Sequence, residues 1–354
     1  MKRSHSIHGI VKFEIVDKTR FPRSVLDKTR SQFANFISGD GGTIDFRVEI
    51  GPFGRRNRSS YVLDDRYCVG KDYFFCRDKR KFAKWALEVN GVETFPVVRL
   101  RTNLAGYYTV PLNVTEFMIQ YMLLRKGMAL VHASGVVKDG VCWLFAARGG
   151  AGKTTLALSL IDDGFGYLGD NFVLLDRGRA WSFLSPLNIF TYNRARIIRE
   201  HLNARQRASM ALKQLIHMLT RGYIKIFEKV NPRAVFPESI VDEARVGCIC
   251  VLQPHSADGS NIPVVRPLGY SELIKKLRYN MELDLLLFNK YMFSYGYLYT
   301  DSLWCNFWDE YEAALMRNIP DSVPRYVAEV PPKWTPDVVA YLSRCCCGGA
   351  LAWE

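Results

Sequence analysis

The residues best suited to chemistry are eight consecutive positions, Ala-Arg-Gly-Gly-Ala-Gly-Lys-Thr, which run from Ala147 to Thr154. In loops of this pattern, glycines without side-chain bulk let successive backbone amides point at phosphate oxygens, and the following helix adds partial positive charge. The lysine, here Lys153, contacts the β- and γ-phosphates, and the hydroxyl of Thr154 coordinates Mg²⁺. The sequence therefore predicts a site for ATP and Mg²⁺, and the alternative is a glycine-rich turn that binds nothing.

The nucleotide is expected to contact the whole loop and the residue after it. Ala147 stands where the pattern has its first glycine, and it suits that position if its backbone angles are ordinary. Phosphoryl transfer also needs positive charge on the transferring group, for which Arg148 and Arg245 are candidates, although each is equally consistent with a surface arginine. The expected nucleotide contacts are Ala147, Arg148, Gly149, Gly150, Ala151, Gly152, Lys153, Thr154 and Thr155.

A candidate acid lies in the turn Gly169-Asp170-Asn171, about 16 residues beyond Thr154. Asp170 suits a general base that accepts the proton of a hydroxyl, or a carboxylate that also contacts Mg²⁺. The alternative is an aspartate that only forms a turn. Asp176, farther along, is a weaker candidate metal ligand, since a solvated strand end explains it equally well.

His132 lies in an apolar run before the loop, where it could line the phosphate site as a donor. A structural histidine is the alternative, and Ser134 is a weaker candidate. We therefore expect catalytic roles for Asp170, Lys153 and His132, and Mg²⁺ contacts from Thr154 and Asp170.

The flanking sequence predicts the elements that position these residues. Two apolar runs, 129–137 and 141–146, flank Asp139-Gly140, which is typical of a hairpin turn. The second run leads directly into the loop, and a helix that ends near Gly164 is expected to follow. Two short strands, 167–168 and 172–175, are then expected on either side of Asp170.

Three segments in this order and spacing resemble the HPr kinase/phosphorylase catalytic domain, whose fold is shared with the ATP-dependent phosphoenolpyruvate carboxykinases. The segments are Val131-His132-Ala133-Ser134-Gly135-Val136, the loop Ala147 to Thr154, and Gly164 to Asp176. They cover about fifty residues. In that family an aspartate that matches Asp170 is the general base on the hydroxyl acceptor. The resemblance therefore implies ATP-dependent phosphoryl transfer to a hydroxyl.

The chain departs from the family at two positions. HPr kinases usually carry a second acid where this chain has Asn171, and an acid where it has Thr155. The wider family includes kinases of free serine and of peptides, so we expect the acceptor to be a serine in a protein or peptide, with a small molecule or sugar next. The reverse phosphorylase reaction stays open. The alternative function is a nucleotide-dependent regulatory or assembly protein with little kinase activity.

The 354 residues predict two domains. Residues 1–112 read as a small β-rich domain of unknown role, with one helix near residues 81–89. Residues 113–345 read as the catalytic domain, which begins with a helix capped by Asn113. We therefore expect an α/β protein in which a P-loop kinase domain of HPr kinase/phosphoenolpyruvate carboxykinase type, with a mixed central sheet, follows the β-rich domain.

The formal net charge of +13 leaves anionic partners open. Its densest part is a basic helical insert at about 190–232, which predicts either a solvated face or a docking surface for an anionic partner. No apolar run reaches the roughly 18 residues of a membrane-spanning helix, and no signal peptide is visible, so we expect a cytoplasmic protein. The sequence leaves open whether the chain forms a homo-oligomer. The nine cysteines, including Cys345-Cys346-Cys347, are expected to be free thiols.

Overall fold

Short runs of β-branched and aromatic residues near the N-terminus form the strands of one sheet. The computed structural model describes residues 2–22, 26, 31–39, 42–54, 60–64, 66–190, 208, 211–212, 227–254, 263–331 and 334–347. It divides into two compact units, one of Met1–Ala129 with Glu282–Ala314 and one of Leu130–Met281 with Leu315–Glu354. Both contain helices and a mixed sheet, which confirms the expected α/β class.

The first unit is built on a sheet that has eight strands within the described residues, in the order β1-β2-β3-β8-β7-β6-β5-β4. Strand β3 is parallel to β2 and β8, and the other pairs are antiparallel. The strands are β1 (Lys2–Ile7), β2 (Val11–Asp17), β3 (Phe46–Ile50), β4 (Tyr61–Leu63), β5 (Tyr67–Gly70), β6 (Tyr73–Arg80), β7 (Ala83–Asn90) and β8 (Val97–Thr102). The helix expected near residues 81–89 is wrong, because this segment is β7, which pairs with β6 and β8 along its length.

The helices of the first unit come from both parts of the chain. They are η1 (Ala34–Phe36), α2 (Leu104–Tyr107), α3 (Val110–Arg125), α9 (Leu286–Gly296) and α10 (Phe307–Asn318), whose last residues belong to the second unit. Helix α3 begins after Thr109, not at Asn113. Its Phe117 stacks on Phe288 of α9 with ring centroids 4.5 Å apart. This packing explains why the unit extends past the expected boundary at residue 112 and includes a later segment.

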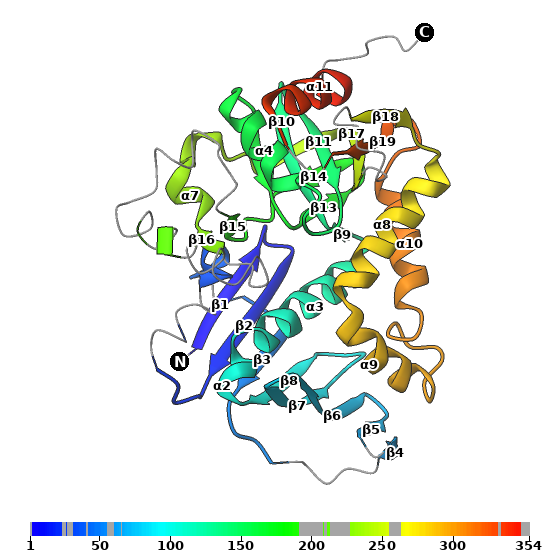
Figure 1. Ribbon diagram of the computed structural model, residues 1–354. Helices are drawn as coiled ribbons and strands as arrows, with labels where there is room; N and C mark the ends of the chain where they lie inside the picture. The colour runs from blue at the N-terminus through cyan, green and yellow to red at the C-terminus, as the bar shows by residue number, and fades with distance from the viewer. Residues whose placement is uncertain are drawn as a thin grey trace. The chain divides into compact units, whose positions relative to one another are not determined.

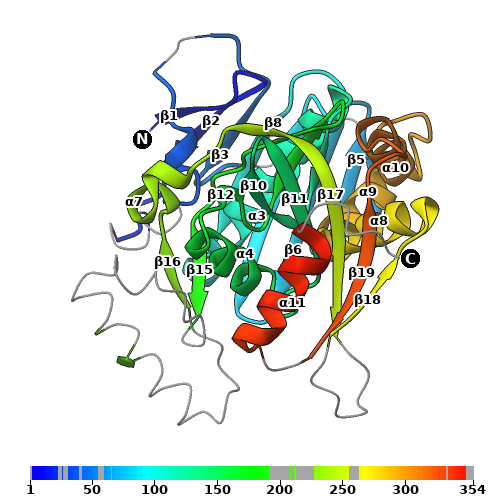
Figure 2. The ribbon, with the colours of Figure 1, turned by 90° about the horizontal axis from the view of Figure 1, so that it is seen from above.

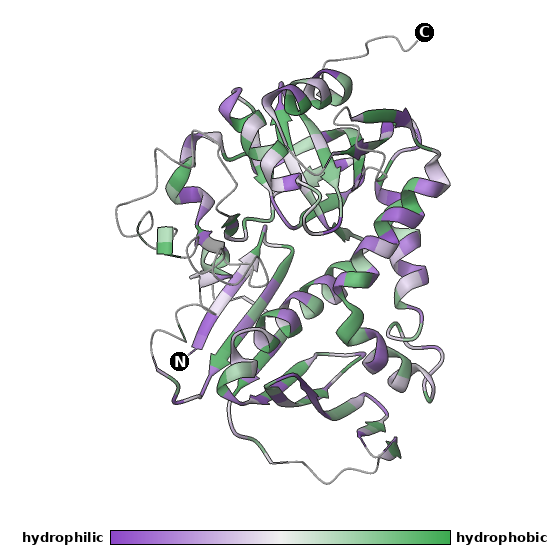
Figure 3. Cartoon of the chain, viewed as in Figure 1, coloured by the Kyte–Doolittle hydropathy of each residue, from purple (hydrophilic) through white to green (hydrophobic). Residues whose placement is uncertain are grey.

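The second unit is built on a sheet in which β11, β17 and β19 are parallel neighbours, flanked by antiparallel strands. Its strands are β9 (Ala129–Val131), which starts in the first unit, β10 (Ala133–Lys138), β11 (Val141–Ala146), β12 (Gly166–Gly169), β13 (Val173–Asp176), β14 (Arg179–Trp181), β17 (Glu243–Pro254), β18 (Val264–Pro267) and β19 (Arg325–Val330). A separate pair consists of β15 (Leu187–Phe190) and β16 (Phe227–Val230). Figure 3 shows β10 and β11 mostly in hydrophobic colours, whereas α8 carries alternating hydrophilic and hydrophobic bands.

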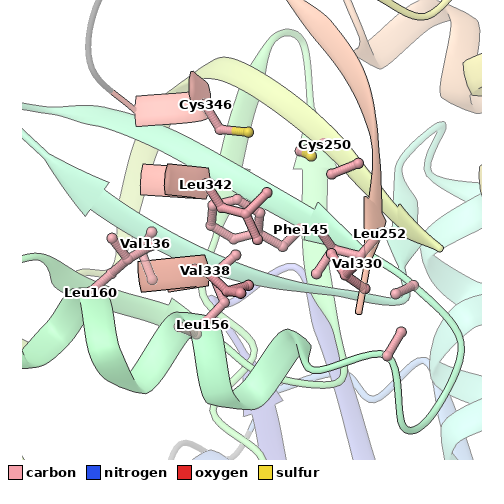
Figure 4. Close-up of a cluster of buried hydrophobic side chains, with 14 of the residues drawn as sticks. Val136, Phe145, Leu156, Leu160, Cys250, Leu252, Val330, Val338, Leu342 and Cys346 are labelled. Atoms are coloured by element: carbon pink, nitrogen blue, oxygen red, sulfur yellow. The ribbon is translucent and has the colours of Figure 1, made fainter. Parts of the chain in front are cut away.

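Two helices, α4 (Lys153–Asp162) and α11 (Pro336–Cys347), pack together on this sheet (Figure 2). Leu156 of α4 and Leu342 of α11 meet Phe145 of β11 in one buried cluster (Figure 4). Cys346 lies in the same cluster, so this member of the Cys345-Cys346-Cys347 segment is a buried free thiol of the hydrophobic core. The unit also contains α7 (Pro232–Val235), η2 (Pro237–Ser239) and α8 (Tyr270–Asp284), whose last residues belong to the first unit.

Most of the expected basic insert at about 190–232 lies outside the described residues. The described part of it includes β16 and the short helix α7. Across the described chain, every helix is too short or too polar to span a membrane.

Candidate functional site

The loop from Ala147 to Gly152 joins the end of β11 to the start of α4 (Figure 1). Gly150 and Gly152 both have φ of +92°, a region in which L side chains are strained. Ala147 is not among the residues with positive φ, so the replacement of the first glycine costs no backbone strain. The sequence thus forms the expected turn, with glycine at the two positions that require it.

The outer face of the loop is open. A Cβ atom added at Gly149 or Gly150 would meet no other atom within 4 Å. Among the described residues, the backbone N–H groups of Gly149 and Gly150 donate to no other group. Unpaired amides at the start of a helix are suited to an anion, so the loop fits phosphate oxygens.

Lys153 is the first residue of α4, and only 7% of it is exposed. Its Nζ donates to the carbonyl oxygen of Ala147 at 2.6 Å and lies 3.1 Å from Nε2 of His132. Burial lowers the pKa of Lys153 to about 8, the Asp170 carboxylate opposes that shift, and Arg148 adds to it. The ammonium therefore stays charged at neutral pH, and no carboxylate of the described residues forms an ion pair with it.

His132, which lies between β9 and β10, is the neighbour of Lys153. Burial, reinforced by the positive charges of Lys153 and Arg148, holds the pKa of His132 well below its ordinary value. A neutral imidazole beside an ammonium must accept through Nε2, which places its proton on Nδ1. The structure therefore brings His132 to Lys153, where its Nε2 accepts from the ammonium, and a contact with phosphate stays a prediction.

Asp170 is 3% exposed and accepts hydrogen bonds on both carboxylate oxygens. Thr154 Oγ1 donates to Oδ2 at 2.8 Å, and Ser134 Oγ donates to Oδ1. Pairing of Gly135 with Gly169 between β10 and β12 sets Ser134 next to Asp170. Ser185 Oγ donates to the Asp170 carbonyl at 3.1 Å, which anchors the turn. The three hydrogen bonds hold Asp170 at the beginning of the loop helix.

A carboxylate that shares a hydrogen bond with the hydroxyl after the loop lysine fits a Mg²⁺ site of the phosphate-loop type. Oxygen ligands are also what Mg²⁺ prefers, with phosphate oxygens completing its shell. Within the described residues, His, Cys, Asp and Glu side chains form no group of three or more that could hold a metal ion by themselves. Thr154 and Asp170 thus suit a metal that arrives with a phosphate ligand.

Two further candidates from the sequence, Arg245 and Asp176, lie away from the loop. Arg245 pairs with Val141 at the end of β11 opposite the loop, so the strand register places this candidate about 17 Å of strand away from the loop. Asp176 ends β13 and is paired only loosely with Arg177, at 3.9 Å, which fits the solvated strand end. Arg148 is exposed in the loop, and its guanidinium donates to the Asn280 carbonyl at 3.4 Å.

Two site residues escape sequence reasoning because distant segments supply them. Asn280 of α8 donates from Nδ2 to the His132 carbonyl at 3.0 Å, which fixes the chain beside the histidine. Trp334, just before α11, lies against the loop, since a Cβ at Gly152 would be 2.0 Å from its Cε2. No local pattern marks either residue, whereas Ser134 lies only two positions after His132, in the adjoining strand β10.

The lowered pKa of Lys153 predicts a pH dependence of ATP binding. Below about pH 8 the amine is charged and the affinity should be constant. As pH rises beyond 8, binding must restore the proton, so the affinity should fall by up to about tenfold per pH unit. Calorimetric titration of ATP from pH 7 to 9.5 measures this, since the phosphates themselves keep one charge state there.

The matched variant for this titration is Lys153→Arg, whose guanidinium stays charged throughout. Its affinity, whatever the absolute value, should stay flat across the same range. A parallel decline in both proteins would mean that another group causes it.

No protein-family model and no curated protein matches this sequence. Among solved structures, the chain is similar to the Hpr(Ser) kinase/phosphatase from Coxiella burnetii. The two are 16% identical, the likeness covers 44% of this chain and 97% of the other, and the TM-score is 0.25. A TM-score this low carries no argument, so the geometry of the site is what supports a function.

Proposed function

We propose that this protein is an ATP-dependent kinase that transfers the γ-phosphoryl group to a hydroxyl acceptor. The observation that carries the proposal is the Asp170 carboxylate, which is buried and bonded to Thr154, the residue after the loop lysine. An open phosphate loop, a charged lysine and a carboxylate with a hydroxyl partner are the parts that phosphoryl transfer uses. The three-segment resemblance to HPr kinases supports the same reading.

Each residue has a defined role in this proposal. The loop amides and Lys153 would hold the phosphates, and the charge of Lys153 would stabilise the transferring group. Bound Mg²⁺ would neutralise phosphate charge, with Thr154 and Asp170 as the residues that hold it. Asp170 would take the proton of the acceptor hydroxyl as its oxygen bonds to the γ-phosphorus, while the electron pair of the broken bond leaves with ADP.

The hydrogen-bonding environment of Asp170 suits a general base that acts on a hydroxyl group. Both of its oxygens already accept from hydroxyl groups, which is the donor type that the acceptor would bring. His132 supports Lys153 by accepting on Nε2 rather than by touching the acceptor. We propose a serine of a protein or peptide as the first acceptor class to test, with free serine and sugars next.

A nucleotide-dependent regulatory or assembly protein is the second candidate. The observation that favours it is Asn171, which follows Asp170 with φ of +79° and supplies no second acid. A site with one carboxylate binds ATP and Mg²⁺ without needing an acceptor. The two candidates therefore differ in whether an acceptor accelerates ATP consumption.

The test is ATP consumption with Mg²⁺, run with serine-bearing peptides, free serine and sugars as acceptors. Wild-type protein should show acceptor-stimulated turnover, and Lys153→Ala should lower it by about 100-fold or more, since a charge on the transferring group is lost. The matched control is Lys138→Ala, which removes an exposed lysine of β10 in the same unit and should stay within about twofold. Tight ATP binding with no turnover under any acceptor would support the regulatory protein instead.

A further inference from the structure

One end of the first unit's sheet carries a concentration of positive charge. Arg77 and Lys79 of β6, Lys84 of β7 and Arg101 of β8 lie on the same face, because Lys79 pairs with Lys84 and Ala86 pairs with both Arg77 and Arg101. All four side chains are exposed. With exposed Arg66, in the turn before β5, they form what we call the basic pocket.

These charges are uncompensated. Among the described residues, none of the five cations in the basic pocket forms an ion pair. Lys79 and Lys84 stand directly opposite each other on neighbouring strands, an arrangement in which like charges repel. Asp78 lies between Arg77 and Lys79 in sequence, but its carboxylate is already bound by Lys290 and by the Tyr291 hydroxyl.

The other end of the same face shows that the sheet can balance its charges. Arg99, two residues before Arg101 on β8, donates to the fully buried Glu88 at 2.9 Å and also lies 3.7 Å from Glu49. Unpaired like charges cost stability, and a ligand that supplies the missing negative charge would remove that cost.

The basic pocket is also hollow. Lys84 and Arg101 lie beside the small side chain of Ala86, and the cavity that these residues line has a volume of about 870 Å³. That is the size range of sites for small ligands and short peptide segments. Trp85 also lines it, and its Nε1 is fixed by a 3.0 Å bond to the Tyr291 hydroxyl.

We propose that the basic pocket binds an acidic peptide segment that carries two or three carboxylates or phosphates. Guanidinium groups bind such groups through paired hydrogen bonds, and the small side chain of Ala86 between Arg77 and Arg101 leaves space between the two guanidinium groups. Three neighbouring strands are only about 10 Å across, which matches a few residues of extended peptide. A nucleic acid needs a longer cationic track, and on β8 the track ends at the balanced Arg99.

This inference does not depend on the proposed kinase activity, because all its residues belong to the first unit. The test is fluorescence anisotropy of a labelled octapeptide with four glutamates, beside the same peptide with phosphoserines and an oligothymidylate of equal charge. At about 0.15 M ionic strength the wild-type protein should bind a peptide at least as tightly as the oligonucleotide. The double variant Lys84→Ala/Arg101→Ala should weaken peptide binding about tenfold or more.

The matched control is Lys2→Ala/Lys18→Ala, which removes the same charge from lysines paired with Glu14 and Glu49. It should change peptide affinity by less than about twofold. Equal losses in the two doubles, no binding by the wild type, or tighter binding of the oligonucleotide would each overturn the proposal. Binding of either peptide, lost only in the pocket variant, supports it and identifies which anion is preferred.

The variants should fold, because Lys84→Ala removes a cross-strand repulsion. Thermal unfolding checks this, and the melting temperature should not fall. Arg66→Ala/Arg101→Ala tests the same pocket with Lys84 left in place, and it should weaken peptide binding by a similar factor.

Discussion

Asp170→Asn should lower acceptor-dependent ATP turnover by about 10³-fold while ATP still binds. The amide keeps the shape of the side chain, and the hydroxyls of Ser134 and Thr154 can reorient to meet it. It cannot take a proton from an acceptor, and it removes the negative charge from the pair of residues proposed to hold Mg²⁺. General bases typically contribute 10²–10⁴-fold, and the expected loss lies within that range.

The measurement is kcat for ATP consumption with saturating acceptor, beside the dissociation constant of ATP from calorimetry. Asp176→Asn is the matched control, because it neutralises a carboxylate at the far end of β13 in the same unit and should leave kcat within about twofold. Unchanged kcat in Asp170→Asn would remove the base from the mechanism and favour the regulatory protein.

Gly152→Ala should be the most damaging single substitution in the loop. Two effects add at this position. Its φ of +92° strains any side chain, which costs about 1–2 kcal/mol. A Cβ there would also lie 2.0 Å from Cε2 of Trp334, so the indole or the loop must move. We expect a loss of ATP affinity of about 100-fold or more, together with a lower melting temperature.

The structure offers a control that separates the two effects. Gly150 has the same φ of +92°, but a Cβ there meets no atom within 4 Å, so Gly150→Ala reports backbone strain alone. In Gly152→Ala/Trp334→Ala the overlap is removed, and stability should recover toward that of Gly150→Ala. A double-mutant cycle of thermal unfolding measures this recovery. Equal destabilisation in Gly150→Ala and Gly152→Ala would show that Trp334 does not restrain the loop.

The parts of the site that the sequence predicts are those set by local patterns. The Asp139-Gly140 hairpin, the apolar strand before the loop, the glycine positions and the helix from Lys153 all depend on residues close together in the chain. Local composition is therefore enough to place Lys153 and Thr154. It also places Asp170 on a turn, although its partners come from elsewhere.

The parts that sequence reasoning misses depend on contacts between distant segments. Asn280 reaches His132 across 148 positions, and only the packing of α8 in the second unit brings it there. The position of Arg245 depends on a contact of the same kind, because the register of β17 against β11 sets its distance from the loop. The segment 81–89 has no strong hydrophobic periodicity of its own. It forms a strand because β6 and β8 pair with it on either side.

The position of Trp334 and α11 has a consequence for synthesis of the chain. The ribosome releases the phosphate loop and α4 long before it releases Trp334, Val338 and Leu342, which cover them. Until those residues emerge, the apolar face of α4 and the sheet beneath it have no cover in the nascent chain. The loop before α4 is therefore covered late in translation, and until then the apolar face of α4 is open to contacts with other chains.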